Sequence, residues 1–280
     1  MKIIITGVEG QLGYAFRKTL KNEELYLTDL PKLDLVSHQA TLDYFQRGQP
    51  ELVIHCAAMT NVDGCELNPD SAYLNNVIAT KNVVNACQIT GAVLVYISTD
   101  YVFDGRADRP YREYDPVNPI NVYGKTKWQG EEIVKMHLDK FFIFRTAWLF
   151  GDIGHNFIWT IYQNAIEGKT LRIVNDQTGS PTYAADLASA IVRLIDTKVY
   201  GIYHITNNGC CTWFEFAKSI LEQANLKEAI LEPISSAELN RPAPRPGYSV
   251  LAKDASHLLG IEMPSFQNAL QRYLDNFSIN

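Results

Sequence analysis

Short apolar runs alternate with amphipathic stretches through the first half of the chain. The runs are four to six residues long and rich in Ile, Leu and Val, as buried strands are. They lie at residues 2–6, 24–28, 52–55, 92–97 and 141–146. Between them, apolar side chains recur at helical spacing. This order predicts an α/β fold with a Rossmann-type doubly wound parallel sheet, right-handed crossovers, and ligands at the carboxyl ends of the strands.

Beyond Gly151 the alternation weakens. Helices are expected at residues 157–166, 185–195, 213–224 and 265–277, and strands at 171–174, 202–205 and 229–234. We therefore expect residues 1–150 to form a dinucleotide-binding domain, which the helix near 183–197 rejoins. Residues 151–280 would be mainly a smaller, substrate-binding α/β lobe, and strand 202–205 is assigned to this lobe.

Three glycines at intervals of three directly follow the first predicted strand. Gly7 permits a tight turn, Gly10 lets the backbone approach a pyrophosphate, and Gly13 lets the following helix pack closely on the strand. Gln11 and Leu12 open that helix, so its first amides face the bound anion. A purely structural turn could also use glycine, but the strand before and the helix after favour dinucleotide binding.

The second predicted strand ends at an acid, Asp29. A carboxylate there can accept hydrogen bonds from the adenosine ribose, which favours NAD over NADP, although it could equally cap a turn. Lys32 lies close enough in sequence to bind a 2′-phosphate, so both NADP(H) and NAD(H) remain open. Asp34 and Leu35 are expected on the adenine side.

Small residues follow the third predicted strand, where a turn would press against the cofactor. Ala57, Ala58 and Thr60 are the expected contacts, although close packing alone would also select small side chains. Asn75 and Asn76 stand in the middle of the long helix that follows, where Asn is mildly unfavourable. We assign Asn76 to the cofactor cleft.

Tyr123 and Lys127 are four positions apart, so on a helix they lie on one face, one turn from each other. An ammonium near a phenol favours the phenolate and lowers the tyrosine pKa from about 10. Such a pair can move a proton to or from a carbonyl or alcohol oxygen. Solvated helices often carry this pair by chance, but its position at the same sheet edge as the glycine turn makes it a candidate catalytic pair.

The fourth predicted strand leads into Ser98 and Thr99. Either hydroxyl could hold a substrate carbonyl against the phenol of Tyr123. The stretch 102–119 is rich in turn formers and is long enough to be a substrate-side loop.

Two further features could contact a substrate. Trp148 follows the fifth predicted strand, where its ring could wall a sugar or base, or could belong to the core. Arg241 and Arg245 lie on a Pro-rich segment and suit a diphosphate, although a solvated loop would also carry them.

Composition narrows the class of protein. The chain has 280 residues, 46% of them hydrophobic and 20% charged, which is ordinary for a soluble globular protein. The formal charge of −6 argues against nucleic-acid or anionic-membrane binding. No apolar run approaches the roughly 20 residues of a membrane span, and no signal peptide is visible, so the expected compartment is the cytoplasm.

The five cysteines are odd in number and form no Cys-x-x-Cys pair. Small buried thiols are therefore expected rather than disulfides or zinc ligands, and no metal site is predicted.

These motifs resemble those of the extended short-chain dehydrogenase/reductase family, and within it the dTDP-4-dehydrorhamnose reductases. The similarity covers essentially the whole chain. The matching segments are 5–13, 98–105, 123–127, 145–148, 179–187 and Arg241-Pro242.

The resemblance implies a reaction and roles for particular residues. NADPH or NADH would pass hydride to C4 of a dTDP-4-keto-6-deoxyhexose, dTDP-4-dehydro-L-rhamnose, while Tyr123 supplies the proton. Lys127 would bind the nicotinamide ribose and lower the tyrosine pKa. Thr99 would position the carbonyl, and Thr99, Asp100 and Trp148 would line the sugar, with Arg241 as a further substrate residue.

One position departs from the family pattern. Relatives that form a metal-bridged dimer use a Glu two residues after the last glycine of the turn, where this chain has Ala15. The resemblance therefore implies a monomer or a homodimer without a bridging metal.

Several other activities remain as alternatives. A 4,6-dehydratase needs two adjacent acids after the Thr, but Tyr101 follows Asp100. A 4-epimerase would use the same Tyr–Lys pair with tightly held NAD⁺, and another nucleotide-sugar 4-ketoreductase would share the whole apparatus. A non-catalytic NADP-binding subunit of methionine adenosyltransferase would not need an intact Thr99, Tyr123 and Lys127.

Overall fold

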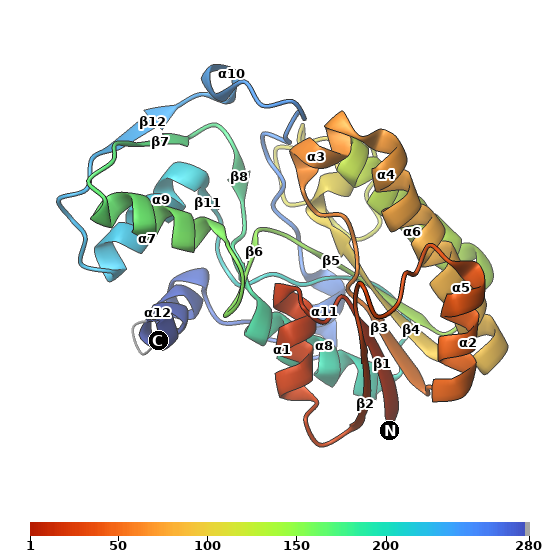
Figure 1. Cartoon of the computed structure of the whole chain (residues 1–280). Helices are drawn as coiled ribbons and strands as arrows, with labels where there is room; N and C mark the ends of the chain where they lie inside the picture. The colour runs from red at the N-terminus through yellow and green to blue at the C-terminus, as the bar shows by residue number, and fades with distance from the viewer. Residues whose placement is uncertain (278–280) are drawn as a thin grey trace.

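The computed structural model describes residues 1–277 and has two lobes joined side by side (Figure 1). The larger lobe is built on a six-stranded parallel sheet. In spatial order its strands are β2 (Glu24–Thr28), β1 (Lys2–Thr6), β3 (Leu52–His55), β4 (Val93–Thr99), β5 (Phe141–Thr146) and β10 (Gly201–His204). The strand order reverses between β1 and β3, and doubly wound sheets bind ligands at the carboxyl edge beside such a reversal.

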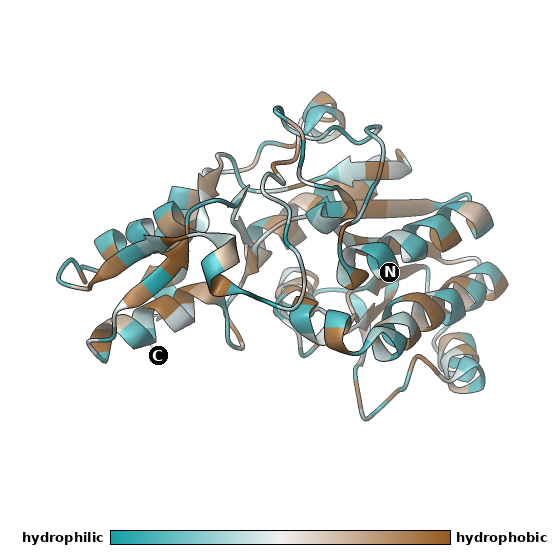
Figure 2. Ribbon diagram, turned by 90° about the horizontal axis from the view of Figure 1, so that it is seen from above, coloured by the Kyte–Doolittle hydropathy of each residue, from teal (hydrophilic) through white to brown (hydrophobic). Residues whose placement is uncertain are grey.

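Helices cover both faces of this sheet, which explains why its strands are apolar on both sides. Ile3, Ile4 and Ile5 of β1 are completely buried. The helices on one face are α1 (Gln11–Thr19) and α8 (Ala184–Thr197), and those on the other are α2 (His38–Gly48), α5 (Ala79–Thr90) and α6 (Val122–His137). Figure 2 shows apolar colouring along the sheet and polar colouring on the outer faces of the helices.

The predicted long helix that carries Asn75 and Asn76 is interrupted. It begins with α4 (Pro69–Tyr73), passes through one π-helical turn, η1 (Leu74–Ile78), and continues as α5. The short helix α3 (Val62–Leu67) precedes it. A π-helical turn inside a helix often marks a functional site, and this one carries Asn75 and Asn76.

The smaller lobe packs helices around an aromatic core that includes Phe150, Phe216 and Tyr273. Its helices are α7 (Phe157–Ile166), α9 (Trp213–Gln223), α10 (Ser236–Leu239) and α12 (Phe266–Phe277). Its short strands are β6 (Leu149–Phe150), β7 (Leu171–Val174), β8 (Thr178–Gly179), β9 (Thr182–Tyr183), β11 (Cys211–Thr212) and β12 (Leu231–Ile234).

The assignment of strand 202–205 to the smaller lobe is wrong. This segment is β10, which pairs in parallel with β5 and forms the edge of the main sheet. Tyr203 and Ile205 pack in the same core as Phe142 and Phe144. Helix α11 (Asp254–Leu258) also returns to the larger lobe and packs against β10.

The stretch 102–119 follows a 3₁₀ turn, η2 (Asp100–Val102), and it packs against residues 248–252. Phe103 is completely buried and stacks on Tyr111 with 4.3 Å between ring centroids. The backbone N–H of Tyr111 donates to the carbonyl of Val250 at 2.8 Å. The described residues of this stretch do not line the cleft, and a substrate-side role for the loop stays a prediction.

All five cysteines are free thiols. Cys65, Cys87 and Cys211 are buried and Cys56 is half-buried, but Cys210 is exposed, contrary to the expectation of buried thiols. Among residues 1–277, no helix has the length and apolar character needed to cross a membrane.

Candidate active site

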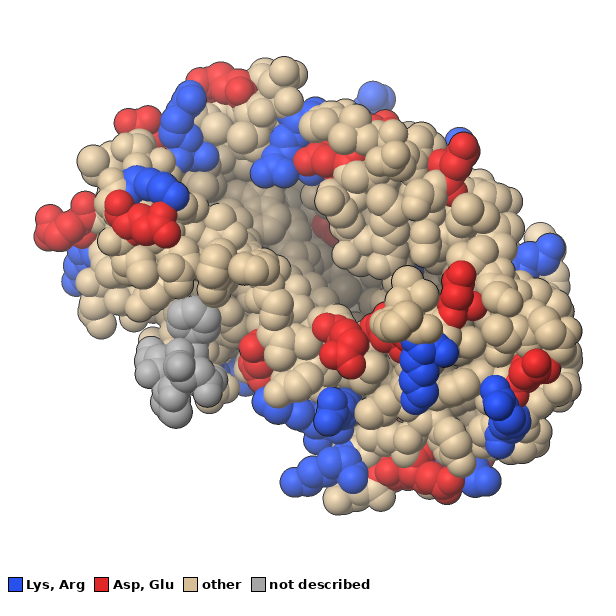
Figure 3. Space-filling model, viewed as in Figure 1, with Lys and Arg blue, Asp and Glu red and all other residues tan. Residues whose placement is uncertain are grey.

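A cleft of about 790 Å³ opens between the two lobes at the carboxyl edge of the main sheet. Residues that follow five successive strands line it, namely Gly7, Asp29, Cys56, Asp100 and Ala147. Figure 3 shows the cleft as a hollow whose interior is largely free of charged side chains, with acids and bases gathered at its rim. The sheet edge predicted to hold the ligands is therefore the edge that is open.

The glycine turn forms the floor of one end of this cleft. Gly7 adopts a left-handed φ of +68°, and a Cβ atom on Gly13 would lie 2.2 Å from the carbonyl oxygen of Gly7. Helix α1 begins at Gln11 with no side-chain cap and no acid in its first turn. Its first amides are therefore available to an anion, as a pyrophosphate site requires.

Asp29 lies beside this turn, at the end of β2. Its carboxylate accepts the backbone N–H groups of Glu9, at 3.1 Å, and Leu30, at 2.9 Å. Lys32 is directed elsewhere, because its ammonium donates to the carbonyl of Leu27 at 2.7 Å and lies over the ring of Tyr44. Asp34 and Leu35 complete this end of the cleft.

Four buried polar atoms in the cleft wall have no hydrogen-bond partner among the described residues. They are Gln11 Oε1, Thr28 Oγ1, Asp100 Oδ2 and Thr146 Oγ1. Buried polar atoms are rarely left unpaired, so these atoms fit a polar ligand that would occupy the cleft. Together with the open amides of α1, they match a dinucleotide.

The turn after β3 brings Ala57, Ala58 and Thr60 to the cleft, as predicted. Asn76 does not reach it. Its side chain is 1% exposed, accepts the N–H of Met59 at 2.8 Å and donates to the carbonyl of Met59 at 3.1 Å. The assignment of Asn76 as a cofactor contact is corrected: it holds the turn in place, and Asn75 is the one that faces the cleft.

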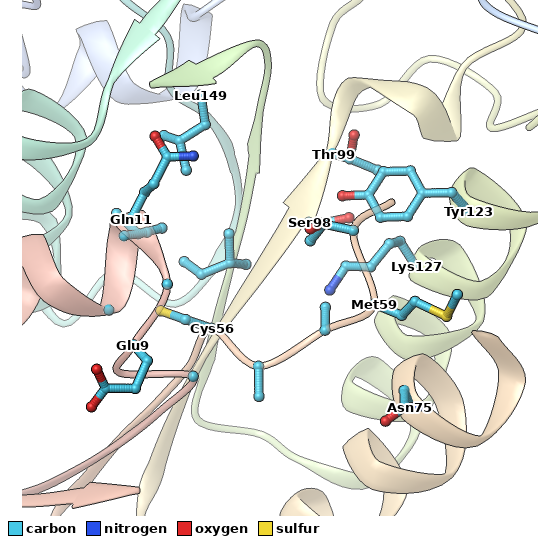
Figure 4. A pocket seen from close by; sticks show the side chains of 18 of the residues that line it. Glu9, Gln11, Cys56, Met59, Asn75, Ser98, Thr99, Tyr123, Lys127 and Leu149 are labelled. Atoms are coloured by element: carbon cyan, nitrogen blue, oxygen red, sulfur yellow. The ribbon is translucent and has the colours of Figure 1, made fainter. Parts of the chain in front are cut away.

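Tyr123, Lys127 and Thr99 converge on the middle of the cleft (Figure 4). Helix α6 begins at the Asn121 cap, whose side chain accepts the N–H of Gly124 at 2.8 Å. A Cβ atom on Gly124 would lie 2.0 Å from the carbonyl oxygen of Tyr101, so the glycine lets the helix press against the loop after β4. The close approach places Tyr123 beside Thr99.

The expected lowering of the tyrosine pKa is not found. Burial raises the pKa of Tyr123, the nearby carboxyl of Asp100 raises it further, and a hydrogen bond with Thr99 offsets this only in part. Lys127 contributes little, because its ammonium lies over the ring of Tyr96, 4.2 Å from the centroid. The phenol therefore holds its proton throughout the neutral range.

Lys127 is itself buried, with 4% of its surface exposed. Desolvation lowers the pKa of its ammonium to about 8, against the opposing charge of Glu131. Burial of a charge in a low-dielectric site disfavours the charged form, which accounts for the direction.

Asp100 is the third ionisable group of this region. The hydroxyl of Thr99 donates to its Oδ1 at 3.0 Å. Burial raises the pKa of Asp100 to about 7, with hydrogen bonds from Ser249 and Thr99 opposing the shift. The carboxyl is therefore poised to change its charge near neutral pH.

Trp148 lines the cleft but is held between other groups. Its ring stacks on that of Trp213, with 3.6 Å between centroids, and a Cβ atom on Gly179 would lie 2.4 Å from it. The backbone of Trp148 has a left-handed φ of +46°, an unusual conformation for a bulky residue that fixes the ring at this place. Trp148 thus belongs both to the cleft wall and to the edge of the smaller lobe's core.

Arg241 does not form part of the cleft wall within the described residues. It donates to Asp63 on α3 at 3.0 Å, and Arg245 donates to the same carboxylate at 2.5 Å. These contacts lower the pKa of Asp63 to about 2. These ion pairs join the segment 241–245 to the larger lobe, and the substrate contact of Arg241 stays a prediction.

Sequence reasoning missed other cleft residues. Met59 and Trp213 both line the cleft. Met59 could have been predicted to line the cleft, because it lies just after β3. Trp213 offered none, because only the packing of the smaller lobe carries the start of α9 to this site.

No group of three His, Cys, Asp or Glu side chains within residues 1–277 is arranged to hold a metal ion. Ala15, the residue at the position of the family's bridging Glu, is 6% exposed on α1.

Comparison with known proteins agrees with this geometry. The chain matches the family described as the RmlD substrate binding domain over residues 1–279. It is 40% identical over 279 residues to the spore coat polysaccharide biosynthesis protein SpsK of Bacillus subtilis, covering 99% of this chain and 98% of that protein.

Solved structures give the same result. A dTDP-4-dehydrorhamnose reductase from Clostridium acetobutylicum is 42% identical, with a TM-score of 0.95 over 99% of this chain and 100% of that one. The enzyme from Bacillus anthracis, solved in complex with NADP, is 43% identical, with a TM-score of 0.95 over 98% of this chain and 99% of that one. The chain therefore belongs to the RmlD substrate binding domain family, together with the dTDP-4-dehydrorhamnose reductases.

Proposed function

We propose that the protein reduces dTDP-4-dehydro-L-rhamnose to dTDP-L-rhamnose, with a reduced nicotinamide dinucleotide as hydride donor and Tyr123 as proton donor. The observation that carries the proposal is the convergence of Tyr123, Lys127 and Thr99 in the same cleft as the glycine turn. Family membership supports the choice of substrate, because relatives of 33–38% identity are named dTDP-4-dehydrorhamnose reductases.

The nicotinamide supplies a hydride for C4 of the ketone, and the protein must supply a proton for O4. Tyr123 fits this role because burial raises its pKa and keeps the phenol protonated at neutral pH. An alkoxide that forms beside it is a far stronger base and takes the proton. We assign Lys127 to the nicotinamide ribose, where its buried ammonium adds a positive charge to the cleft.

Thr99 has a single hydroxyl proton, and Asp100 controls where it points. When Asp100 is ionised, the proton goes to Asp100 Oδ1. When Asp100 is protonated, Thr99 is free to donate into the cleft. Because the pKa of Asp100 is raised to about 7, we infer that Thr99 donates best to a substrate carbonyl on the acidic side of neutrality.

We infer that NADH binds more tightly than NADPH. Glu9, Asp29 and Asp34 line the end of the cleft where the adenosine ribose would lie, and Lys32 is directed away from it. A 2′-phosphate there would meet acids instead of a base, and like charges repel. We assign the Asp29 carboxylate to the ribose hydroxyls.

The test is the oxidation of NADH and NADPH, followed by loss of reduced-nicotinamide absorbance. The 4-keto sugar is generated in place by a 4,6-dehydratase acting on dTDP-glucose and a 3,5-epimerase. We expect oxidation that requires the epimerase. Oxidation without it would indicate a different 4-keto sugar, and cofactor binding with no oxidation would favour a non-catalytic role.

Tyr123→Phe tests the proton donor. We expect nearly unchanged NADH affinity and a turnover reduced by roughly 10²–10⁴, the range for loss of a general acid. Wild-type turnover by this variant would contradict the assignment. Tyr14→Phe, a change of the same kind on α1, is the matched control and should leave turnover unchanged.

A further inference from the structure

An acid continues the stripe of candidate catalytic residues along α6. Tyr123, Lys127 and Glu131 follow one another at intervals of four, and Glu131 is completely buried. The helix approaches β4 closely at this point, because a Cβ atom on Gly130 would lie 2.2 Å from the hydroxyl of Tyr96. A buried carboxylate therefore stands one turn behind the Tyr–Lys pair.

Three hydrogen bonds hold this carboxylate. Arg145 from β5 donates from Nε to Glu131 Oε1 at 2.9 Å and from Nη2 to Oε2 at 2.7 Å, a bidentate pair. Ser98 from β4 donates from its hydroxyl to Oε1 at 2.5 Å. Bidentate, charge-assisted bonds are strong and directional, so the three side chains form one rigid unit across α6, β4 and β5.

The other side of Arg145 is also occupied. Its Nη1 donates to the carbonyl of Glu113 at 3.2 Å and lies 3.4 Å from His204 Nε2. Burial and Arg145 lower the pKa of His204 to about 3, so the ring is neutral. His204 Nδ1 faces the carbonyls of Tyr111 and Ala252 at 3.1 and 3.0 Å, so Nδ1 carries the proton and Nε2 accepts.

The unit has a consequence for Ser98, which lines the cleft. Its hydroxyl gives its only proton to Glu131, so toward the cleft the oxygen can only accept a hydrogen bond. Ser98 therefore cannot donate to a substrate carbonyl while Glu131 is ionised. Of the two neighbouring hydroxyls, only that of Thr99 remains for this task.

We propose that Glu131 is a positioning residue for the reaction. It fixes the Ser98 hydroxyl as an acceptor, and its buried carboxylate, which is paired with Arg145, lies one helical turn from Lys127. This inference rests on the proposed function, in which Lys127 binds the nicotinamide ribose.

The charge of Lys127 depends on this carboxylate. Its titratable and charged neighbours on the packed elements are Glu131 and Tyr123 on α6, His55 on β3, Cys56 after β3, Tyr96 on β4 and Arg145 on β5. Burial lowers the pKa of His55 to about 3 and raises that of Cys56 to about 12, so both are uncharged at neutral pH. Glu131 raises the pKa of Lys127 against burial more than Cys56 does, so the loss of Glu131 should deprotonate Lys127 at lower pH.

The experiment uses the double variant Glu131→Gln/Arg145→Met, which removes both buried charges together and leaves neither unpaired. NADH affinity is measured by fluorescence from pH 6 to 10, beside turnover. Wild-type affinity should fall as pH rises through about 8. In the double variant this fall should begin about one pH unit lower, the low end of the pKa shift that a nearby opposite charge causes.

Two reference variants show whether the change in the pH profile comes from Lys127 and from Glu131. Lys127→Met should bind NADH weakly with no alkaline fall, which assigns the fall to Lys127. Glu132→Gln removes the neighbouring acid, whose side chain is 42% exposed, and should leave the pH profile unchanged. A folded double variant with the wild-type pH profile would overturn the proposal.

If the double variant does not fold, the variant Ser98→Ala tests the proposal instead. This change keeps both buried charges, and we expect kcat to fall about tenfold with NADH affinity unchanged, the equivalent of one charge-assisted hydrogen bond. A wild-type kcat would overturn the proposal. Because NADH binding needs no sugar, a wild type that binds NADH but fails to reduce the sugar would count against the proposed function alone.

Discussion

Gly13 and Gly10 occupy similar places in the turn but differ in what surrounds them, so alanine substitutions should separate folding from cofactor binding. A Cβ atom on Gly13 would lie 2.2 Å from Gly7 O, 2.7 Å from Val8 Cα and 2.9 Å from Gly7 C. All three atoms are backbone, so no side chain can move aside. A Cβ atom on Gly10 would meet only Gly7 O, at 3.3 Å, and Gly10 has an ordinary φ of −82°.

The expected magnitudes follow from these contacts. Alanine is intrinsically better than glycine in a helix by roughly 1 kcal/mol, and Gly13 lies within α1. Overpacking costs about 1–3 kcal/mol or more, and a backbone clash falls at the high end. We expect Gly13→Ala to lower the free energy of unfolding by about 2 kcal/mol net. Gly10→Ala should lower it by less than about 1 kcal/mol but raise the Kd for NADH about tenfold, because its methyl group enters the pyrophosphate's path.

Urea unfolding followed by tryptophan fluorescence gives the first quantity, and NADH titration gives the second. The reasoning fails if Gly13→Ala is as stable as the wild type. It also fails if Gly10→Ala loses as much stability as Gly13→Ala, since the two would then not differ in their steric surroundings.

Three further outcomes are expected. Asp29→Ser should narrow the preference for NADH over NADPH about tenfold, as judged by the ratio of the two Kd values, because the acid no longer repels a 2′-phosphate. Gly179→Ala should displace Trp148 and raise the KM for the sugar, with the Kd for NADH unchanged as the control measurement. Asp63→Asn should lower the Tm at pH 7, because Arg245 holds the pKa of Asp63 at about 2. The stability that this carboxylate contributes is present above its unfolded pKa of about 3.9 and is lost as pH falls through 2, so the Tm difference from the wild type should vanish near pH 2.

The parts of the site that local sequence specifies were predictable. The glycine turn, the apolar strands and the Tyr123–Lys127 spacing each follow from steric and periodic rules that act over a few residues. Because parallel strands share one carboxyl edge, these local features together indicated a common cleft, and the structure places them there.

The features that the sequence did not reveal depend on contacts between segments that are far apart in the chain. Asn76 is unfavourable in the middle of a helix, and this marked it as a residue with a special role. Its hydrogen bonds with Met59, in the turn after β3, could not be predicted from the sequence. The pairing of Arg241 with Asp63 joins residues 178 positions apart. The raised pKa of Tyr123 reflects burial, which the spacing of two side chains cannot reveal.

Strand 202–205 shows the same limit at the level of the fold. Its apolar residues indicated a buried strand, but nothing in them distinguishes one sheet from another. Its place beside β5 is determined by α8, which carries the chain back across the sheet.

The return of α8, β10 and α11 to the larger lobe constrains how this protein can be altered or can diverge. The two lobes are not formed by successive segments of the chain, because the strand at one edge of the main sheet comes from beyond residue 200. A fragment ending at residue 150 would expose the face that α8 covers and is expected to aggregate. Transferring sugar specificity from a relative would require transplanting three separate stretches, around 151–180, 208–247 and 264–277, while the intervening residues stay with the recipient. New specificities in such a chain are therefore expected to arise by point changes in the cleft wall more readily than by exchange of whole segments.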